Sequence, residues 1–234
     1  MSAASIRARV RAEMTEEIKS IARRHLASDG ANLSLRAVAR DLGVVSSAIY
    51  RYFGSRDELL TALIIDAYNS LGETVERADG DQPREELQAR WLAVAHAVRD
   101  WALAQPHEYA LIYGSPVPGY QAPQDTVGPA TRGTLVLGGI LSDGVELNLL
   151  NGSSSEALPE TVQRELAQLR KLAFPNVPEG LLARGMGGWI LIFGAVSFEL
   201  FGQFDTVLTD RRAFFDYQMR GAYTQITGSV ARSG

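Results

Sequence analysis

The chain has no cysteine, only three histidines and no uncharged apolar run as long as a bilayer span. The lack of cysteine excludes disulfides, thiolate zinc sites, iron–sulfur ligation and cysteine nucleophiles. The longest uncharged apolar run, residues 185–198, holds 14 residues, whereas a transmembrane helix needs about 18–20. We therefore expect a cytoplasmic protein with no membrane segment.

Signatures of catalysis are missing as well. The sequence contains no G-x-S-x-G, no G-x-x-x-x-G-K-[ST] and no H-E-x-x-H, the patterns of nucleophile elbows, phosphate loops and zinc peptidases. His25, His96 and His107 are too scattered to suggest a set of metal ligands. We predict that the protein is not an enzyme and uses no metal or cofactor.

Charge is distributed unevenly over the 234 residues. Ten basic and five acidic residues lie in residues 1–56, a net charge of +5, whereas the remainder carries −9. A basic front end on an acidic body favours contact of the front end alone with a polyanion. Arginines on a solvated helix face would give the same count, so charge alone does not decide.

Most of the chain has the periodicity of amphipathic helices, with apolar residues spaced by three and four. No alternating strand pattern occurs, so we predict an all-α fold. The predicted helices cover residues 15–29, 35–42, 46–52, 57–78, 83–105, 159–173, 179–203 and 210–227. We interpret residues 79–83 as a linker, residues 114–133, with four prolines and four glycines, as an extended loop, and Asn151–Glu156 as a surface turn.

Residues 35–53 have the pattern of a helix-turn-helix motif. Two short helices meet at a tight turn, which needs a small residue at the crossing and a glycine in the turn. Ala39 and Gly43 occupy these positions, and apolar residues that can pin the pair from inside surround them. Two short core helices joined by glycine would match part of this pattern.

The flanking residues extend the pattern to a family. The run SLRAVARDLGVVSSAIYRYFGSRDELLTALI closely resembles the N-terminal domain of the tetracycline-repressor (TetR) family of bacterial transcription regulators, and the likeness covers about residues 12–72. The resemblance implies a three-helix DNA-binding domain over 1–56 with an N-terminal arm, a connecting helix over 57–78, and a larger ligand-binding and dimerisation domain over 79–234.

The motif assigns roles to particular residues. The third helix should enter the major groove with its first residues toward the base edges, so we expect base contacts from Val45, Ser46, Ser47 and Ala48. Phosphate contacts are expected from Ser34, Arg36, Tyr50, Arg51, Tyr52 and Arg56. Core packing is the alternative for Tyr52 and plain solvation for Arg51, and the N-terminal arginines are either an arm on the DNA or a tail.

The C-terminal part carries a weaker resemblance to a TetR subgroup in which a long helix holds Trp, three residues, then His-Gly. Here Trp189 is followed by Phe193-Gly194, so phenylalanine replaces the histidine and removes a hydrogen-bonding group. The resemblance implies a ligand site, for which we nominate Trp91, Trp101, Tyr109, Tyr113, Trp189 and Phe193, with ordinary core packing as the alternative for each. No charged cluster interrupts these segments, which favours a mainly hydrophobic ligand.

The last two predicted helices are more apolar around their circumference than packing on one side requires. Burial against a second subunit explains this, and the alternative is a monomer with an internal helix. We nominate Gly194, Phe198, Phe201, Phe215 and Tyr217 for a homodimer interface.

Together these observations predict a dimeric regulator, in the family's usual mode a repressor, that binds a palindromic operator in double-stranded DNA and is released by a small effector. The two half-sites of such a palindrome lie about 34–36 Å apart. The alternative is an all-α ligand-binding or scaffold module that does not bind DNA.

Overall fold

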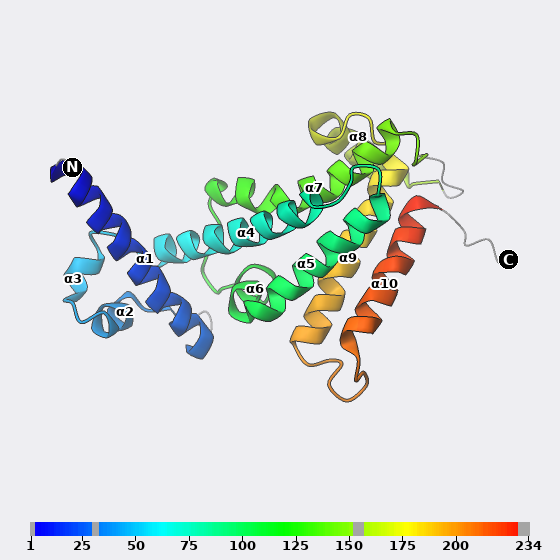
Figure 1. Cartoon of the computed structure of the whole chain (residues 1–234). Helices are drawn as coiled ribbons and strands as arrows, with labels where there is room; N and C mark the ends of the chain where they lie inside the picture. Colours follow the sequence, from blue (N-terminus) through cyan, green and yellow to red (C-terminus); the bar gives the residue numbers. More distant parts are fainter. Residues whose placement is uncertain (1–2, 30–32, 152–156, 229–234) are drawn as a thin grey trace. The chain divides into compact units, whose positions relative to one another are not determined.

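A computed structural model describes residues 3–29, 33–151 and 157–228 of the chain. In those residues the chain forms ten α-helices and one short 3-10 helix, with no strand, which confirms the all-α prediction (Figure 1). By contacts the chain divides into two compact units: unit 1, residues 1–70 and 105–130, and unit 2, residues 71–104 and 131–234.

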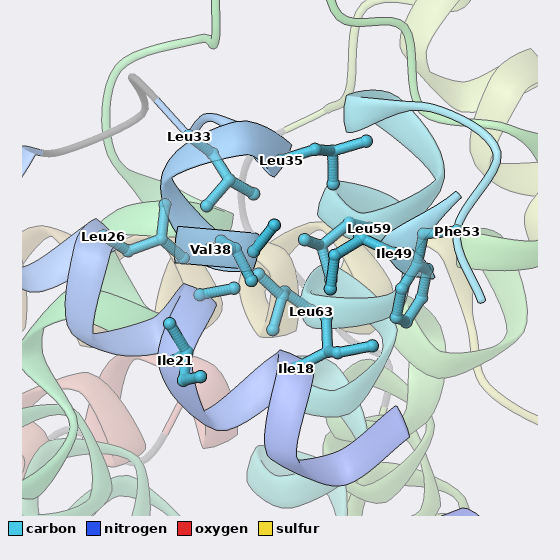
Figure 2. Packing of buried hydrophobic residues seen from close by; sticks show 12 residues of the cluster. Ile18, Ile21, Leu26, Leu33, Leu35, Val38, Ile49, Phe53, Leu59 and Leu63 are labelled. Carbon is cyan, nitrogen blue, oxygen red and sulfur yellow. The ribbon is translucent and has the colours of Figure 1, made fainter. Parts of the chain in front are cut away.

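Unit 1 is built around the N-terminal helices. Its elements are α1 (Ala3–Asp29), α2 (Leu35–Asp41), α3 (Ser46–Ile49), the first part of α4 (Arg56–Gly80), α6 (Pro106–Tyr113) and η1 (Gln124–Thr126). Apolar side chains of α1, α2, α3 and α4 point toward one another in one core, with Val38, Ile49 and Leu59 at most 1% exposed (Figure 2). This shared core holds the two helices of the turn motif at a fixed crossing.

Unit 2 is a layered bundle. Its elements are the second part of α4, α5 (Leu87–Ala104), α7 (Val127–Glu146), α8 (Glu160–Ala173), α9 (Glu179–Leu200) and α10 (Arg211–Thr227). The helices α5, α9 and α10 contact one another, and α8 packs on α9; α9 and α10 run side by side (Figure 1). Each helix buries its apolar stripe against its neighbours, as amphipathic helices do.

Local signals set most helix ends. Ser34 caps α2, accepting from the Ala37 amide, and Asp210 caps α10, accepting from the Ala213 amide at 2.9 Å. Before α4, Ser55 Oγ accepts from the Glu58 amide at 3.1 Å and Glu58 in turn accepts from the Gly54 amide. These side chains satisfy amides that a helix start leaves unpaired.

Two predictions about the first helices are wrong. Helix α1 begins at Ala3 rather than near Thr15, since residues 3–14 consist largely of the helix formers alanine, arginine and glutamate. The basic side chains before residue 12 therefore lie on a helix and not in an extended arm. Helix α3 ends at Ile49 rather than at Tyr52, and residues 50–52 form a turn in which the Tyr52 amide donates to Ile49 O.

Two later boundaries also differ from the prediction. Helix α5 begins at Leu87 rather than at Pro83, because a turn with a hydrogen bond from the Glu86 amide to Pro83 O precedes it. Helix α7 begins at Val127, so the loop predicted over 114–133 is shorter; Pro129 lies in its first turn, where a missing amide costs nothing. Of the predicted turn Asn151–Glu156, all but Asn151 lies outside the described residues.

Candidate DNA-binding face and ligand cavity

The turn between α2 and α3 has the geometry that the sequence predicts. Gly43 has a φ of +74°, in the left-handed region that favours glycine. Ala39 is 1% exposed at the crossing, and its carbonyl accepts from the Val44 amide at 3.0 Å. The positive φ of Gly43 and the buried small side chain of Ala39 are the two features that a helix-turn-helix motif needs here.

The start of α3 presents small side chains to solvent. Val45, which precedes the helix in extended conformation, is 71% exposed, and Ser46 and Ser47 are exposed as well. Ala48 is half-buried and Ile49 is buried in the core. The predicted base-contacting residues thus share an accessible surface, with Ala48 at its edge.

Groups suited to phosphate contact flank this surface. Ser34 and Arg36 are exposed at the start of α2, and Tyr50, at 49% exposure, and Arg51 follow α3. Exposed hydroxyls, guanidinium groups and helix-terminal amides are the groups that proteins use on DNA phosphates. Tyr52 is half-buried and packs on the core of unit 1, so its ring contributes to packing.

An arginine from α1 braces this region. Arg11 Nη2 donates to Arg51 O at 3.1 Å, and its guanidinium lies 5.2 Å from the centroid of the Tyr52 ring. The contact joins α1 to the turn after α3. Sequence reasoning missed this role, because the two residues are 40 positions apart and no local pattern connects them.

Arg56 makes structural contacts at the start of α4. Its Nε donates to Leu33 O at 3.1 Å and its Nη1 to Asp57 at 3.2 Å. The first bond holds the segment before α2 against α4. The phosphate contact predicted for Arg56 stays a prediction, and it would have to coexist with these bonds.

Charged residues tie α1 to α4 and α6 within unit 1. Asp66 accepts from Lys19 Nζ at 2.7 Å and from Arg23 Nη2 at 2.6 Å, and Arg23 Nε lies 3.1 Å from Glu108. Burial lowers the pKa of Lys19, but hydrogen bonds to Asp66 and Glu16 outweigh it, so the pKa is raised overall. The ammonium is thus charged and paired, and the helix that carries the arginines is anchored.

Unit 2 contains a cavity of about 530 Å³, within the size range of small-molecule sites. Helices α5, α7, α8, α9 and α10 and the segments that adjoin α7 and α8 line it. Its lining residues are overwhelmingly aliphatic or aromatic, and none is acidic or basic. A pocket of this composition suits a hydrophobic molecule.

Only some of the predicted ligand residues line the cavity. Trp91 and Trp189 line it, whereas Phe193, 4.3 Å from the Trp189 ring between centroids, does not. Trp101 is buried in unit 2 away from the lining. Tyr109 and Tyr113 belong to unit 1, where their rings pack together.

Exposed apolar side chains follow one face of α9. Phe198 is 53% and Phe201 50% exposed, and Gly194 is also exposed; on α10, Tyr217 is 72% exposed. These four predicted interface residues are accessible on the protomer. Within the described residues, α9 is also the one helix long and apolar enough to cross a membrane, a test that helices packed inside proteins pass as well.

Phe215, which the sequence analysis places in the dimer interface, is buried within the protomer. It is 2% exposed, and its ring packs on His96 at 5.4 Å between centroids and under the Arg99 guanidinium. Phe215 therefore belongs to the core of its own protomer. The cause is the helical register, since Phe215 falls on the face of α10 that α5 covers, together with Met219 and Ala222.

The turn geometry and the exposed start of α3 define a helix-turn-helix protein. Residues 19–63 match the family described as bacterial regulatory proteins, tetR family, and residues 91–222 match the tetracyclin repressor-like C-terminal domain. The HTH-type transcriptional regulators Rv1816 of Mycobacterium tuberculosis and Mb1846 of Mycobacterium bovis are each 41% identical over 217 residues, 90% of this chain and 91% of each relative.

Solved structures agree with these matches. SCO4313 superposes with a TM-score of 0.76 at 33% identity, over 92% of this chain and 97% of that one. The TetR family regulator PfmR of Thermus thermophilus, with a TM-score of 0.56 at 16% identity over 92% and 99% of the chains, shares the fold. The chain belongs to the TetR family of transcriptional regulators and is not an enzyme. The subgroup likeness around Trp189 stays a prediction.

Proposed function

We propose that this regulator is a cytoplasmic repressor that binds a palindromic operator as a homodimer and releases it when a small, mainly hydrophobic ligand fills the cavity of unit 2. The observation that carries the proposal is the exposed start of α3, after the turn at Gly43. It lies in the basic residues 1–56, which we call the head. The predicted division into a DNA-binding part (1–56), a connecting helix (57–78) and a ligand and dimer part (79–234) is retained in this proposal.

Base recognition would depend on small side chains. Val45 offers methyl groups, which suit the C5 methyl of thymine, and Ser46 and Ser47 offer hydroxyls, which pair with several base edges. No arginine, asparagine or glutamine stands at these positions for bidentate readout. We therefore infer that phosphate contacts, centred on Ser34 and Arg36, supply much of the affinity and little of the specificity.

The dimer is supported by the exposed face of α9. Ile190, at 68% exposure, continues the row formed by Gly194, Phe198 and Phe201, and Gly187 extends it by another turn. Apart from its chain neighbours, no side chain in the described part of the protomer lies within 4 Å of where a Cβ on Gly187 or Gly194 would be. A second α9 could approach closely there, and the four helices α9 and α10 of two protomers would bury the row.

Release of DNA by a ligand requires that a conformational change at the cavity reach residues 1–56. Helix α4 is continuous from Arg56 to Gly80 and has residues in both units. We propose that filling the cavity favours a conformation in which α4 holds the two heads of the dimer at the wrong spacing. A coupling free energy of about 1–3 kcal/mol would weaken operator binding roughly 5–150-fold.

Selection of bound sequences from a random DNA pool with the purified protein tests this function. A palindrome with half-sites about one helical turn apart is expected, with an affinity that falls steeply as salt rises. Arg36→Ala should weaken operator binding and reduce the salt dependence, whereas Arg164→Ala, which removes an exposed arginine of α8, should do neither. Absence of any selected sequence at low salt would refute DNA binding and favour a ligand-binding module.

A further inference from the structure

We propose that the cavity of unit 2 selects an uncharged amphiphile, with its apolar body inside and a hydroxyl group at the rim formed by Thr131 and Thr134 on α7. The proposal rests on the ligand-regulated function above and specifies the chemical class of that ligand. It follows from the lining of the cavity, from the pairing of the nearby charges and from the exposure of the rim.

The inner wall of the cavity is largely aliphatic, and its side chains with a polar atom are Trp91, Trp189 and Tyr223. Buried aliphatic residues of α7, α9 and α10 form much of it, among them Leu137, Leu182 and Ile226. The indole of Trp91 also lines it, but its Nε1 already donates to Met219 O at 2.8 Å. A polar group placed among these aliphatic side chains would lose its water and gain no partner.

Two charged side chains next to the lining are already paired, whereas the Nη2 of Arg184 on α9 is buried with no hydrogen-bond partner among the described residues. Arg132, beside Thr131 on α7, donates to both carboxylate oxygens of Glu76 at 2.7 and 2.6 Å. Arg170 on α8 donates to Glu179 at 3.0 Å. Neither arginine lines the cavity, so a ligand carboxylate would find no counterion among them, and a ligand cation would find no acid in the wall.

The rim gives the ligand its orientation. Thr131 and Thr134 are exposed, three residues apart on one face of α7. The exposed lining residues of the neighbouring helices are apolar, with Leu172 of α8 at 86% exposure and Met186 of α9 at 49%. The mouth therefore lies between α7, α8 and α9, and its polar side is the threonine pair.

One rim hydroxyl is oriented to accept a hydrogen bond. Thr134 Oγ1 donates its proton to Thr131 O at 2.7 Å. The lone pairs of this hydroxyl can therefore accept a hydrogen bond from a ligand. An alcohol can donate to such an oxygen, whereas a carboxylate or a quaternary ammonium cannot. An alcohol with a long apolar body meets both the wall and the rim.

The test is a titration of the full-length protein, without DNA, by four probes that differ in charge and length. Fluorescence of Trp91 and Trp189, which line the cavity, reports binding of 1-octanol, 1-decanol, decanoate and decyltrimethylammonium. Each added methylene should tighten binding about fourfold, so we expect decanol to bind about 16-fold more tightly than octanol. Both ions should bind at least tenfold more weakly than decanol.

Equal or tighter binding of either ion would overturn the proposal. A preference for decanoate would point instead to Arg184 on α9, whose Nη2 is buried with no hydrogen-bond partner in the described part of the chain while its Nε donates to Ile226 O. Absence of binding by all four probes would overturn it as well.

Rim variants test the orientation. Thr134→Val keeps the shape and removes the acceptor, so decanol should bind several-fold more weakly while the gain per methylene persists. Thr134→Lys should invert the order, with decanoate above decanol. Thr161→Val, an exposed threonine of α8 outside the lining, is the matched control. Unchanged decanol affinity in Thr134→Val would overturn the placement of the hydroxyl.

A second assay tests the proposed function independently of the ligand class. A mobility-shift assay with the selected operator shows whether decanol releases DNA. Tight decanol binding with no release supports the ligand class and refutes regulation through this cavity. Release by decanol together with the predicted order of the four probes supports both.

Discussion

The buried ion pair between α5 and α9 provides a quantitative test of how unit 2 is held together. Arg99 donates through Nε to Glu199 Oε2 at 2.8 Å and through Nη2 to Oε1 at 2.6 Å, and their side chains are only 8% and 7% exposed. We expect Arg99→Met to lower the free energy of unfolding by about 3–5 kcal/mol, because it leaves an unpaired carboxylate inside the protein.

The reverse change should cost less. In Glu199→Met the guanidinium keeps Asp100, 3.2 Å away and half exposed, and lies over the Phe215 ring. An ion pair with such an exposed partner contributes up to about 1 kcal/mol. We therefore expect the loss of unfolding free energy in Glu199→Met to be smaller than in Arg99→Met by up to about 1 kcal/mol. The double variant should come close to the parent, since two methionines pack where two charges had to be desolvated.

Urea denaturation followed by circular dichroism measures these differences, at one protomer concentration because a dimer's stability depends on it. Arg212→Met is the matched control: it removes a surface arginine, 59% exposed, that pairs with Asp100, and should cost less than about 1 kcal/mol. The reasoning is refuted if Arg99→Met costs no more than Arg212→Met, or if the double variant loses as much as the two single variants together.

Four further outcomes are expected. Replacing thymine by uracil opposite Val45 in the selected operator should weaken binding about fourfold per half-site, measured by anisotropy, and Val45→Ser should be insensitive to that replacement. Gly43→Ala should lower stability in urea by about 1–2 kcal/mol because of its positive φ, whereas Gly139→Ala, within α7 with open space around it, should raise it by about 0.5–1 kcal/mol; equal effects would contradict the backbone argument. Phe198→Glu should give monomers by light scattering, and Val207→Glu, at a position that is 72% exposed but lies beyond α9, should not. Acid titration should destabilise the protein below about pH 4, because ion pairs hold several carboxyl pKa values below their usual range in the fold, so that protonation favours the unfolded chain as the pH falls through the folded values; constant stability down to pH 2 would contradict this. The carboxyls concerned are Asp41, Glu76 and Asp216, whose pKa values are lowered chiefly by hydrogen bonds from His25, Arg132 and Arg220, respectively.

Much of the fold could be predicted from short stretches of sequence. Ser34 and the pair Ser55 and Glu58 mark helix starts through bonds to amides within four residues, and Gly43 marks the turn through its own φ. Where local signals are weak or compete, the helix boundaries differ from the predicted ones. A turn after Ile49 stands where the last residues of the third helix were predicted.

The candidate sites were predictable only in part. Helical periodicity places Trp189 and Phe193 on one face of α9, but it does not say which ring reaches the cavity and which packs beside it. In the same way it does not separate Phe215 of α10, buried in the protomer, from Tyr217 of α10, exposed to solvent. These choices depend on which neighbour covers each face.

By itself the sequence determined the helical class, the helix-turn-helix head and its exposed small residues, because caps, glycine conformations and the 3.6-residue period act over a few positions. Only the tertiary structure decided the brace of Arg11 on Arg51, the pair of Arg99 with Glu199 and the walls of the cavity. The two arginine contacts join residues 40 and 100 positions apart. Such partners are chosen by the packing of whole helices, since burial of one face of a helix fixes the neighbours of every side chain on it.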